Sequence, residues 1–119
     1  SERQTKTNDR LNLTVALSYG GRAEIVETTK KISNLFKRGD IKFSDIDENL
    51  FSSNLYTNDI PDPDLLIRTS GEKRISNFLL WQLAYTELVF IDTLWPDFSD
   101  ADFDFSISEY QRRDRRYGV

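Results

Sequence analysis

The residues best suited to chemistry lie close together in one loop of the chain. Arg68 would end a short apolar strand, and Arg74 and Ser76 would begin the helix that follows. Two guanidinium groups, a hydroxyl and the free N–H groups of a helix N-terminus are the donors that bind a phosphate or diphosphate group. The spacing leaves a second interpretation open, in which the arginines pair with Glu72 or Asp64 at the surface and Ser76 only caps the helix.

Glu87 is the second residue that could take part in chemistry. It follows Leu83, Ala84, Tyr85 and Thr86, and this largely apolar context favours partial burial. A carboxylate placed there could bind Mg²⁺, which prefers one or two carboxylates together with substrate phosphates. The alternative is a solvated glutamate at the end of a helix, and the residue type alone does not separate the two.

The residue types that are missing exclude several kinds of enzyme. The 119 residues include no Cys and no His, so thiolate catalysis, zinc–thiolate sites, imidazole ligands and a Ser-His-Asp triad are excluded. Sixteen Lys and Arg against twenty Asp and Glu give a net charge of -4. This balance shows no basic excess of the kind that indicates nucleic-acid binding.

The chain contains no Met, even at position 1, so we expect either a processed N-terminus or a piece of a longer protein. Its first residues lack the apolar region of a signal peptide. The most apolar stretch, residues 78–95, is interrupted by polar and acidic residues, which does not favour a membrane span. A cytoplasmic protein is therefore expected.

The first half of the chain predicts a strand followed by helices. The strand is expected over residues 11–19, where the apolar positions that alternate with polar or small residues are Leu11, Leu13, Val15, Leu17 and Tyr19. Gly20-Gly21 lacks the spacing of a phosphate-binding glycine motif and indicates a tight turn. Helical spacing from Ala23 predicts a helix that ends near Gly39, and a second short helix is expected from about Ser44.

The second half predicts two buried strands and two helices. The apolar runs 65–67 and 88–91 are typical of strands in a parallel sheet. A helix is predicted over residues 76–87, and another after Ser99, which can cap it with Asp102 near the third position. The alternation predicts an α/β fold with a largely parallel sheet layered with helices. Three strands are few for a covered sheet, so we expect the fold to be incomplete in this chain.

Six stretches carry a resemblance to a known family, and they are residues 18–22, 62–72, 74–82, 84–87, 94–98 and 113–118. They resemble motifs of the cis-prenyltransferases, most of all those of bacterial undecaprenyl diphosphate synthases, also called isoprenyl transferases. The resemblance covers essentially all of the chain. Because the family's Asp-Gly-Asn-x-Arg-Trp motif is absent, it implies that residues 1–119 are the C-terminal part of a single catalytic domain.

The resemblance implies an enzyme that condenses isopentenyl diphosphate units onto an allylic diphosphate such as farnesyl diphosphate. The new double bonds have cis geometry, and the implied product is undecaprenyl diphosphate. Mg²⁺ is the implied cofactor, and the implied enzyme is a cytoplasmic, membrane-peripheral homodimer that delivers its product to the membrane. No covalent intermediate is implied, so no catalytic nucleophile is assigned. Without the upstream half, the chain alone is expected to be inactive.

The same resemblance assigns roles to individual residues. The implied substrate-binding residues are Arg68, Arg74, Ser76, Arg116 and Gly118. The first three match the family's isopentenyl diphosphate site, and the last two match an Arg-x-Gly motif that touches substrate in the partner subunit. Glu87 matches a glutamate implicated in Mg²⁺ binding. Lys73 stands where close bacterial relatives often have His, and because a protonated Lys cannot ligate a metal, it could only contact a phosphate.

Three other interpretations stay open. The first is a non-catalytic partner subunit of a heteromeric cis-prenyltransferase, against which the presence of the whole set of site residues argues. The second is an enzyme with a shorter cis-prenyl product, since product length depends on residues outside this chain. The third is a generic nucleotide-binding α/β module, which rests on fold analogy alone.

Overall fold

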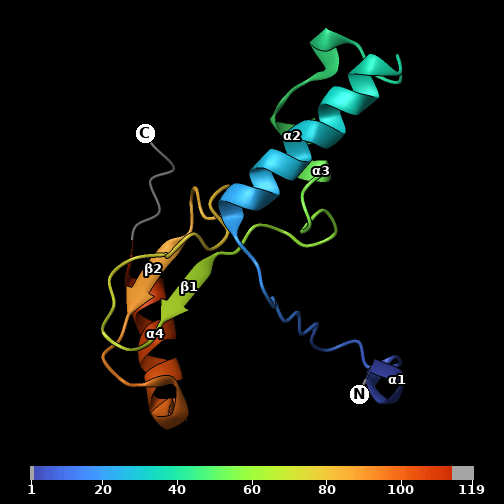
Figure 1. The fold of residues 1–119 in the computed structure, drawn as a ribbon. Helices are drawn as coiled ribbons and strands as arrows, with labels where there is room; N and C mark the ends of the chain where they lie inside the picture. Colours follow the sequence, from blue (N-terminus) through green and yellow to red (C-terminus); the bar gives the residue numbers. More distant parts are fainter. Residues whose placement is uncertain (1, 114–119) are drawn as a thin grey trace.

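The computed structural model describes residues 2–113 of the chain. Its helices and strands follow one another in an order that mixes the two types (Figure 1). They are α1 (Glu2–Thr5), α2 (Gly21–Lys37), the short 3-10 helix η1 (Phe43–Asp45), α3 (Glu48–Ser53), β1 (Leu65–Arg68), β2 (Glu87–Phe90), η2 (Trp95–Asp97) and α4 (Asp100–Arg112).

The two strands form a parallel pair, which confirms the predicted α/β fold. Leu65 of β1 lies opposite Glu87 of β2, and the register continues to Arg68 opposite Phe90. Helix α4 packs against β2, whereas α2 extends away from the sheet with α3 beside it (Figure 1). Val89 and Ile91 are buried, at 2% and 7% exposed, whereas every residue of β1 is only partly buried. The predicted burial is therefore confirmed for part of the 88–91 run and not for residues 65–67.

The predicted start of the last helix is also confirmed. The Ser99 side chain accepts a hydrogen bond from the backbone N–H of Asp102, and an Asp102 carboxylate oxygen accepts one from the backbone N–H of Ser99 at 2.9 Å. This reciprocal arrangement satisfies two donors that the first turn of a helix leaves open. The hydrogen bonds from Ser99 and then from Thr93 hold the pKa of Asp102 below its ordinary value.

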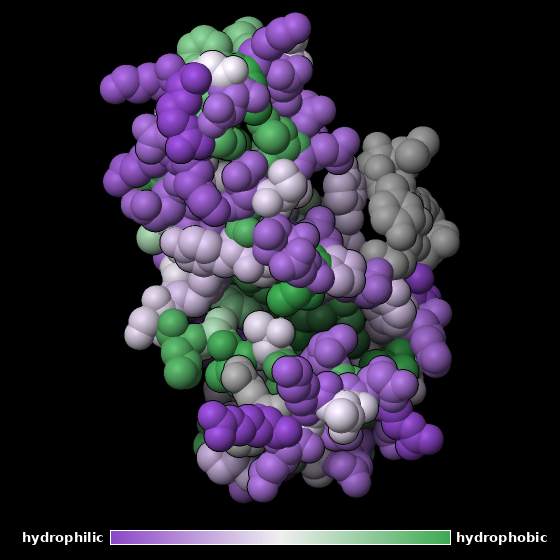
Figure 2. Space-filling model, turned by 90° about the vertical axis from the view of Figure 1, so that its right-hand side faces the viewer, coloured by the Kyte–Doolittle hydropathy of each residue, from purple (hydrophilic) through white to green (hydrophobic). Residues whose placement is uncertain are grey.

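The predicted strand over residues 11–19 is not present. Leu11, Leu13 and Leu17 are each at least 80% exposed. A strand needs a neighbour for its backbone hydrogen bonds and a surface for its apolar face, and the described residues give this segment neither. The space-filling view shows apolar surface exposed about midway between two ends that are mostly hydrophilic (Figure 2).

The predicted helix over residues 76–87 is wrong as well, because this segment forms turns that lead directly into β2. Ser76, Asn77 and Leu79 have φ angles of 46°, 64° and 47°, which lie outside the right-handed helical region. The segment instead packs across α3, where the Trp81 indole N–H donates to the Ser52 hydroxyl at 3.0 Å. Tertiary contacts therefore replace the local helix that the apolar pattern favoured.

A buried carboxylate joins these parts. Glu24 of α2 is 1% exposed, and its two oxygens accept hydrogen bonds from the Tyr19 hydroxyl, from the Tyr56 N–H at 2.8 Å and from the Gln82 amide at 3.2 Å. The same Gln82 nitrogen also donates to the Thr57 hydroxyl at 3.0 Å. Because a buried charge is tolerated only when it is hydrogen-bonded, Glu24 fixes the loop that precedes α2, the loop that follows α3 and the turns before β2 relative to one another.

We expect Glu24→Ala to lower the free energy of unfolding by about 3 kcal/mol, because each buried donor that loses its acceptor costs about 1–3 kcal/mol. Urea unfolding followed by circular dichroism measures this change. Glu27→Ala is the matched control on the same helix, where Glu27 is exposed and pairs with Lys30 at 3.1 Å. The control should stay within about 0.5 kcal/mol of the original protein, and equal losses for both variants would contradict the role given to Glu24.

The same cluster makes stability depend on pH in the alkaline range. Desolvation, and then the hydrogen bond and negative charge of Glu24, raise the pKa of Tyr19 far above its ordinary value of about 10. The unfolded chain releases this proton near pH 10 while the folded chain keeps it, so the stabilisation is complete below that pH and is lost above it. Urea titrations at increasing pH measure this effect. Above pH ~10, the free energy of unfolding should fall less steeply in Tyr19→Phe than in the original protein. Tyr85→Phe, which changes an exposed tyrosine, is the control and should show the same pH dependence as the original protein.

Candidate functional site

Arg68 lies at the carboxyl end of β1, the edge at which ligands bind in parallel α/β sheets. Its Nη1 donates to the Ser76 hydroxyl at 2.8 Å and to the backbone oxygen of Arg74. The structure thus places Arg68 beside Ser76 and the backbone of Arg74, so the three predicted residues meet in one loop, although Arg74 contributes its carbonyl oxygen to this contact and not its guanidinium. Both acceptors are neutral, and within residues 2–113 no ion pair of Arg68 is recorded, so its positive charge is held in place without being neutralised.

Arg74 forms a surface ion pair, as in the alternative interpretation of the sequence. Its guanidinium pairs with Glu72 at 2.5 Å, and both side chains are largely exposed. An exposed pair of this kind contributes about 0–1 kcal/mol, so it can open at little cost. The alternative of surface pairing therefore holds for Arg74 and not for Arg68.

Ser76 does not begin a helix, which corrects part of the predicted anion site. With φ at 46° it belongs to the turns that replace the expected helix. The free helix N–H groups that were predicted to join the two arginines are therefore missing from this loop. The donors that remain are the guanidinium groups, the hydroxyl and single backbone N–H groups of a strained turn.

Glu87 lies apart from this loop. It is the first residue of β2 and pairs with Leu65, at the opposite end of β1 from Arg68. Its carboxylate is 23% exposed and accepts a hydrogen bond from Arg113 at 3.0 Å, and the same Arg113 nitrogen donates to the backbone oxygen of Leu88 at 2.7 Å. The structure therefore does not bring Glu87 and Arg68 into one cluster.

The donor chemistry at Glu87 fits one ligand of a magnesium ion. No group of three or more acidic side chains able to hold a metal occurs within residues 2–113. A single carboxylate suits Mg²⁺ when substrate phosphates supply further oxygens, and a cation, the Arg113 guanidinium, already occupies this carboxylate. Arg116 and Gly118, the other two predicted substrate-binding residues, lie outside the described residues.

Sequence reasoning missed Asn77 and gave Glu24 and Gln82 no role. Asn77 contacts the first turn of α2 through two hydrogen bonds, and Gln82 is buried against Glu24. The signal for Gln82 was present, because a polar residue inside the apolar run 78–85 is either exposed or has a buried partner. The signal for Asn77 was weaker, since Asn tolerates positive φ but does not require it.

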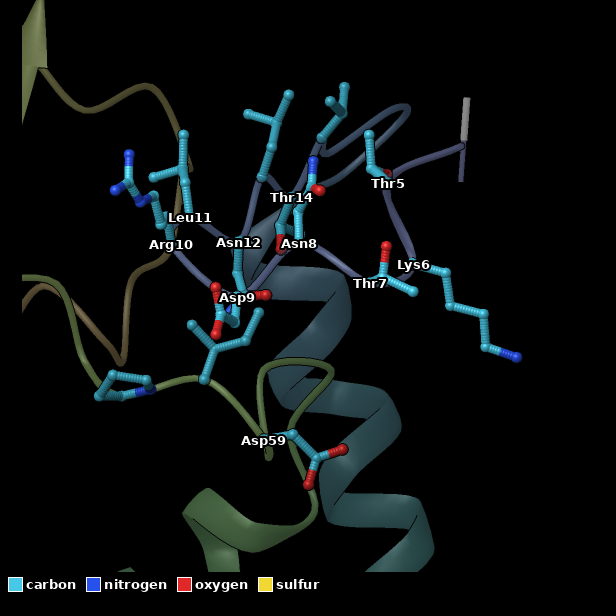
Figure 3. Close-up of a pocket in the computed structure, with 14 residues that line it drawn as sticks. Thr5, Lys6, Thr7, Asn8, Asp9, Arg10, Leu11, Asn12, Thr14 and Asp59 are labelled. Carbon is cyan, nitrogen blue, oxygen red and sulfur yellow. The ribbon is translucent and has the colours of Figure 1, made fainter. Parts of the chain in front are cut away.

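An open hollow of about 1600 Å³ lies elsewhere, between residues 5–15 and the loop at 59–61. Figure 3 shows that most of the side chains labelled there come from the N-terminal segment, with Asp59 on the facing loop. None of the predicted site residues lines it. One wall is the exposed segment that forms no strand, so the hollow reflects missing packing and not an enclosed binding site.

Among the described residues, no helix combines the length and apolar character needed to cross a bilayer.

Comparison with known proteins identifies the family of the chain. The family model described as "Putative undecaprenyl diphosphate synthase" matches residues 1–118. The isoprenyl transferase of Prochlorococcus marinus subsp. pastoris is 55% identical over 99% of this chain and 43% of its own length. The farnesyl-diphosphate-specific ditrans,polycis-undecaprenyl-diphosphate synthase of Micrococcus luteus is 49% identical over 99% of this chain and 47% of its own length.

A solved structure gives the same result for the fold. Lavandulyl diphosphate synthase from Lavandula x intermedia, in complex with dimethylallyl diphosphate, superposes with a TM-score of 0.93 at 42% identity. The match covers 99% of this chain and 51% of that one, so the chain spans about half the length of the relatives it matches. On these findings, the chain belongs to the undecaprenyl diphosphate synthase family of prenyltransferases.

Proposed function

We propose that the intact protein condenses isopentenyl diphosphate units onto an allylic diphosphate, farnesyl diphosphate, with cis geometry, and that its product is undecaprenyl diphosphate. The observation that carries this proposal is Arg68, which is fixed by the Ser76 hydroxyl and the Arg74 carbonyl and has no recorded ion pair within residues 2–113. A cation held by neutral groups is prepared to bind an anion with little rearrangement.

In this proposal, Arg68 and Ser76 bind the diphosphate of isopentenyl diphosphate, and Arg74 joins them by leaving Glu72. The release costs little because the Arg74–Glu72 pair is exposed. Holding the two substrates in a fixed relative position turns their reaction into an effectively unimolecular step. The residues of this chain thus bind and orient one substrate, and no covalent bond to the protein is needed.

The proposal extends to the parts of the enzyme that the described residues do not include. A homodimer, contact of Arg116 and Gly118 with substrate, a cytoplasmic location and delivery of product at the membrane follow from the family resemblance. A shorter product is the second candidate, and it is favoured by the fold match to a lavandulyl diphosphate synthase. The length of the chains formed by the intact enzyme from labelled isopentenyl diphosphate separates these two candidates.

We also propose Mg²⁺ as the cofactor, with Glu87 as one of its ligands. When bound, Mg²⁺ supplies positive charge to substrate phosphates. Glu87 can take this role when Arg113 releases its carboxylate, and the half-buried position of the carboxylate keeps it attractive to a cation.

We expect the isolated chain to have no activity, because it spans only about half of the relatives' length.

We expect Arg68→Ala in the intact protein to raise the dissociation constant for isopentenyl diphosphate roughly tenfold to a hundredfold, because hydrogen bonds to charged groups contribute about 1.5–3 kcal/mol. Isothermal titration calorimetry measures the binding, and turnover should fall as well. Arg38→Ala is the control, since Arg38 is an exposed arginine that pairs with Asp40 at 2.7 Å away from the loop. Equal affinity of Arg68→Ala and Arg38→Ala would refute the assignment of this site.

The Mg²⁺ proposal predicts opposite effects of two substitutions. Removal of divalent cations with EDTA should abolish turnover of the intact enzyme, and Mg²⁺ should restore it. Glu87→Gln should raise the Mg²⁺ concentration for half-maximal activity, because a ligand charge is lost. Arg113→Ala should lower that concentration, because a competing cation is removed. A shift in the same direction for both variants, or none, would argue that Glu87 serves only as the partner of Arg113.

A further inference from the structure

Asn77 supplies the N-terminal cap of α2 from a distant part of the chain. The residue before the helix, Gly20, has no side chain to accept a hydrogen bond. Instead, the Gly21 N–H donates to the backbone oxygen of Asn77 at 2.7 Å, and the Arg22 N–H donates to its side-chain oxygen at 2.9 Å. Both donors belong to the first turn of a helix, where no partner exists within the helix itself. One residue thus satisfies two of these donors.

The two glycines allow this contact because they let the loop approach the helix closely. A Cβ atom at Gly21 would lie 2.8 Å from Leu80 Cγ and 3.0 Å from the Asn77 oxygen. A Cβ atom at Gly20 would lie 3.0 Å from the Asn77 side-chain nitrogen. The sequence predicted a tight turn at this pair, and the structure shows a further requirement for glycine. A side chain at position 21 would push the loop away from α2.

The contact also holds the backbone of the loop in an unusual conformation. Ser76 and Asn77 both have positive φ, at 46° and 64°, a region that non-glycine residues occupy rarely and at some cost. The two hydrogen bonds from α2 offset this cost at Asn77. The preceding residue, Ser76, presents its hydroxyl to Arg68 at 2.8 Å. A continuous series of contacts therefore runs from α2 through Asn77 and Ser76 to the Arg68 guanidinium.

We propose that Asn77 is a positioning residue of the diphosphate site: by joining the loop to the first turn of α2, it fixes Ser76 and so the orientation of Arg68. The inferred effect of Asn77 on substrate binding rests on the proposed function. Asn77 acts through its neighbour and is assigned no contact with substrate. The two N–H groups of α2 that it occupies are thereby unavailable as anion ligands.

Asn77→Gly tests the proposal because glycine accepts the positive φ and keeps the backbone oxygen that caps Gly21, while the whole side chain, with the oxygen that accepts from the Arg22 N–H, is lost. In the intact protein, we expect the dissociation constant for isopentenyl diphosphate to rise about five- to tenfold, in line with the loss of one hydrogen bond of about 1 kcal/mol. Gly21→Ala, which acts from the helix side, should weaken binding in the same direction. Unchanged affinity in both variants would overturn the proposal.

Asp47→Ala is the matched control. The Asp47 side chain caps α3 by accepting a hydrogen bond from the Leu50 N–H at 2.8 Å, so the variant loses the same kind of bond at another helix. It should lower the thermal midpoint about as much as Asn77→Gly and leave the affinity for isopentenyl diphosphate unchanged. If it weakens binding equally, the effect of Asn77→Gly reflects general destabilisation and the proposal fails.

A measurement without ligand separates this inference from the proposed function. The measurement is the NMR spectrum of the intact protein with ¹⁵N-labelled arginine. The hydrogen bonds of Arg68 Nη1 should give its side-chain resonance a chemical shift different from those of exposed arginines. We expect Asn77→Gly to collapse that difference and Asn77→Asp, which keeps an acceptor for Arg22, to preserve it. An unchanged Arg68 signal in Asn77→Gly overturns the inference. Failure of the original protein to bind isopentenyl diphosphate, with the signal changing as expected, overturns the proposed function alone.

Discussion

The Glu24 carboxylate sets the arrangement of the described residues. A charged group that is 1% exposed must find hydrogen-bond donors, and the donors here come from three segments far apart in the sequence: Tyr19, Tyr56 and Gln82. Satisfying one carboxylate therefore places the start of α2, the chain after α3 and the turns before β2 side by side. Because Asn77 and Ser76 lie within those turns, a polar contact in the interior also determines where the loop beside Arg68 lies.

The loop itself uses neutral groups to hold its central cation. A hydroxyl and a backbone carbonyl fix the orientation of Arg68 without cancelling its charge. Arg74, by contrast, is paired with an acid at the surface. The two arginines therefore differ in their readiness to bind an anion: Arg68 is already in place, whereas Arg74 must first leave Glu72. Glu87 and Arg113 form a separate pair at the other end of the sheet. The candidate residues therefore lie in two separate places, the loop beside Arg68 and the Glu87–Arg113 pair.

Local signals in the sequence predicted much of the fold. The capping box at Ser99 and Asp102, the helical spacing after Ala23 and the short apolar runs of β1 and β2 all depend on neighbours in the chain. Residues 11–19 and 76–87 were predicted wrongly because their conformation depends on partners elsewhere. The first segment has no neighbouring strand among the described residues, and the second is held by α2 and α3 through Asn77 and Trp81. For the site, the sequence predicted the convergence of Arg68, Arg74 and Ser76, whereas the role of Asn77 follows only from the tertiary contact.

The uncancelled charge of Arg68 has a consequence beyond the bound state. The chain carries a net charge of -4, so its acidic side chains outnumber the cations that can attract an anion. Within the described residues, Arg74 of this loop is paired with Glu72, so the cations of the loop that have no ion pair are Arg68 and Lys73, and they make it attractive to an anion. Fields of this kind steer charged ligands and are screened over about 10 Å at 0.1 M salt. The rate at which an anion reaches this loop therefore depends on ionic strength, even though the contacts formed afterwards are short.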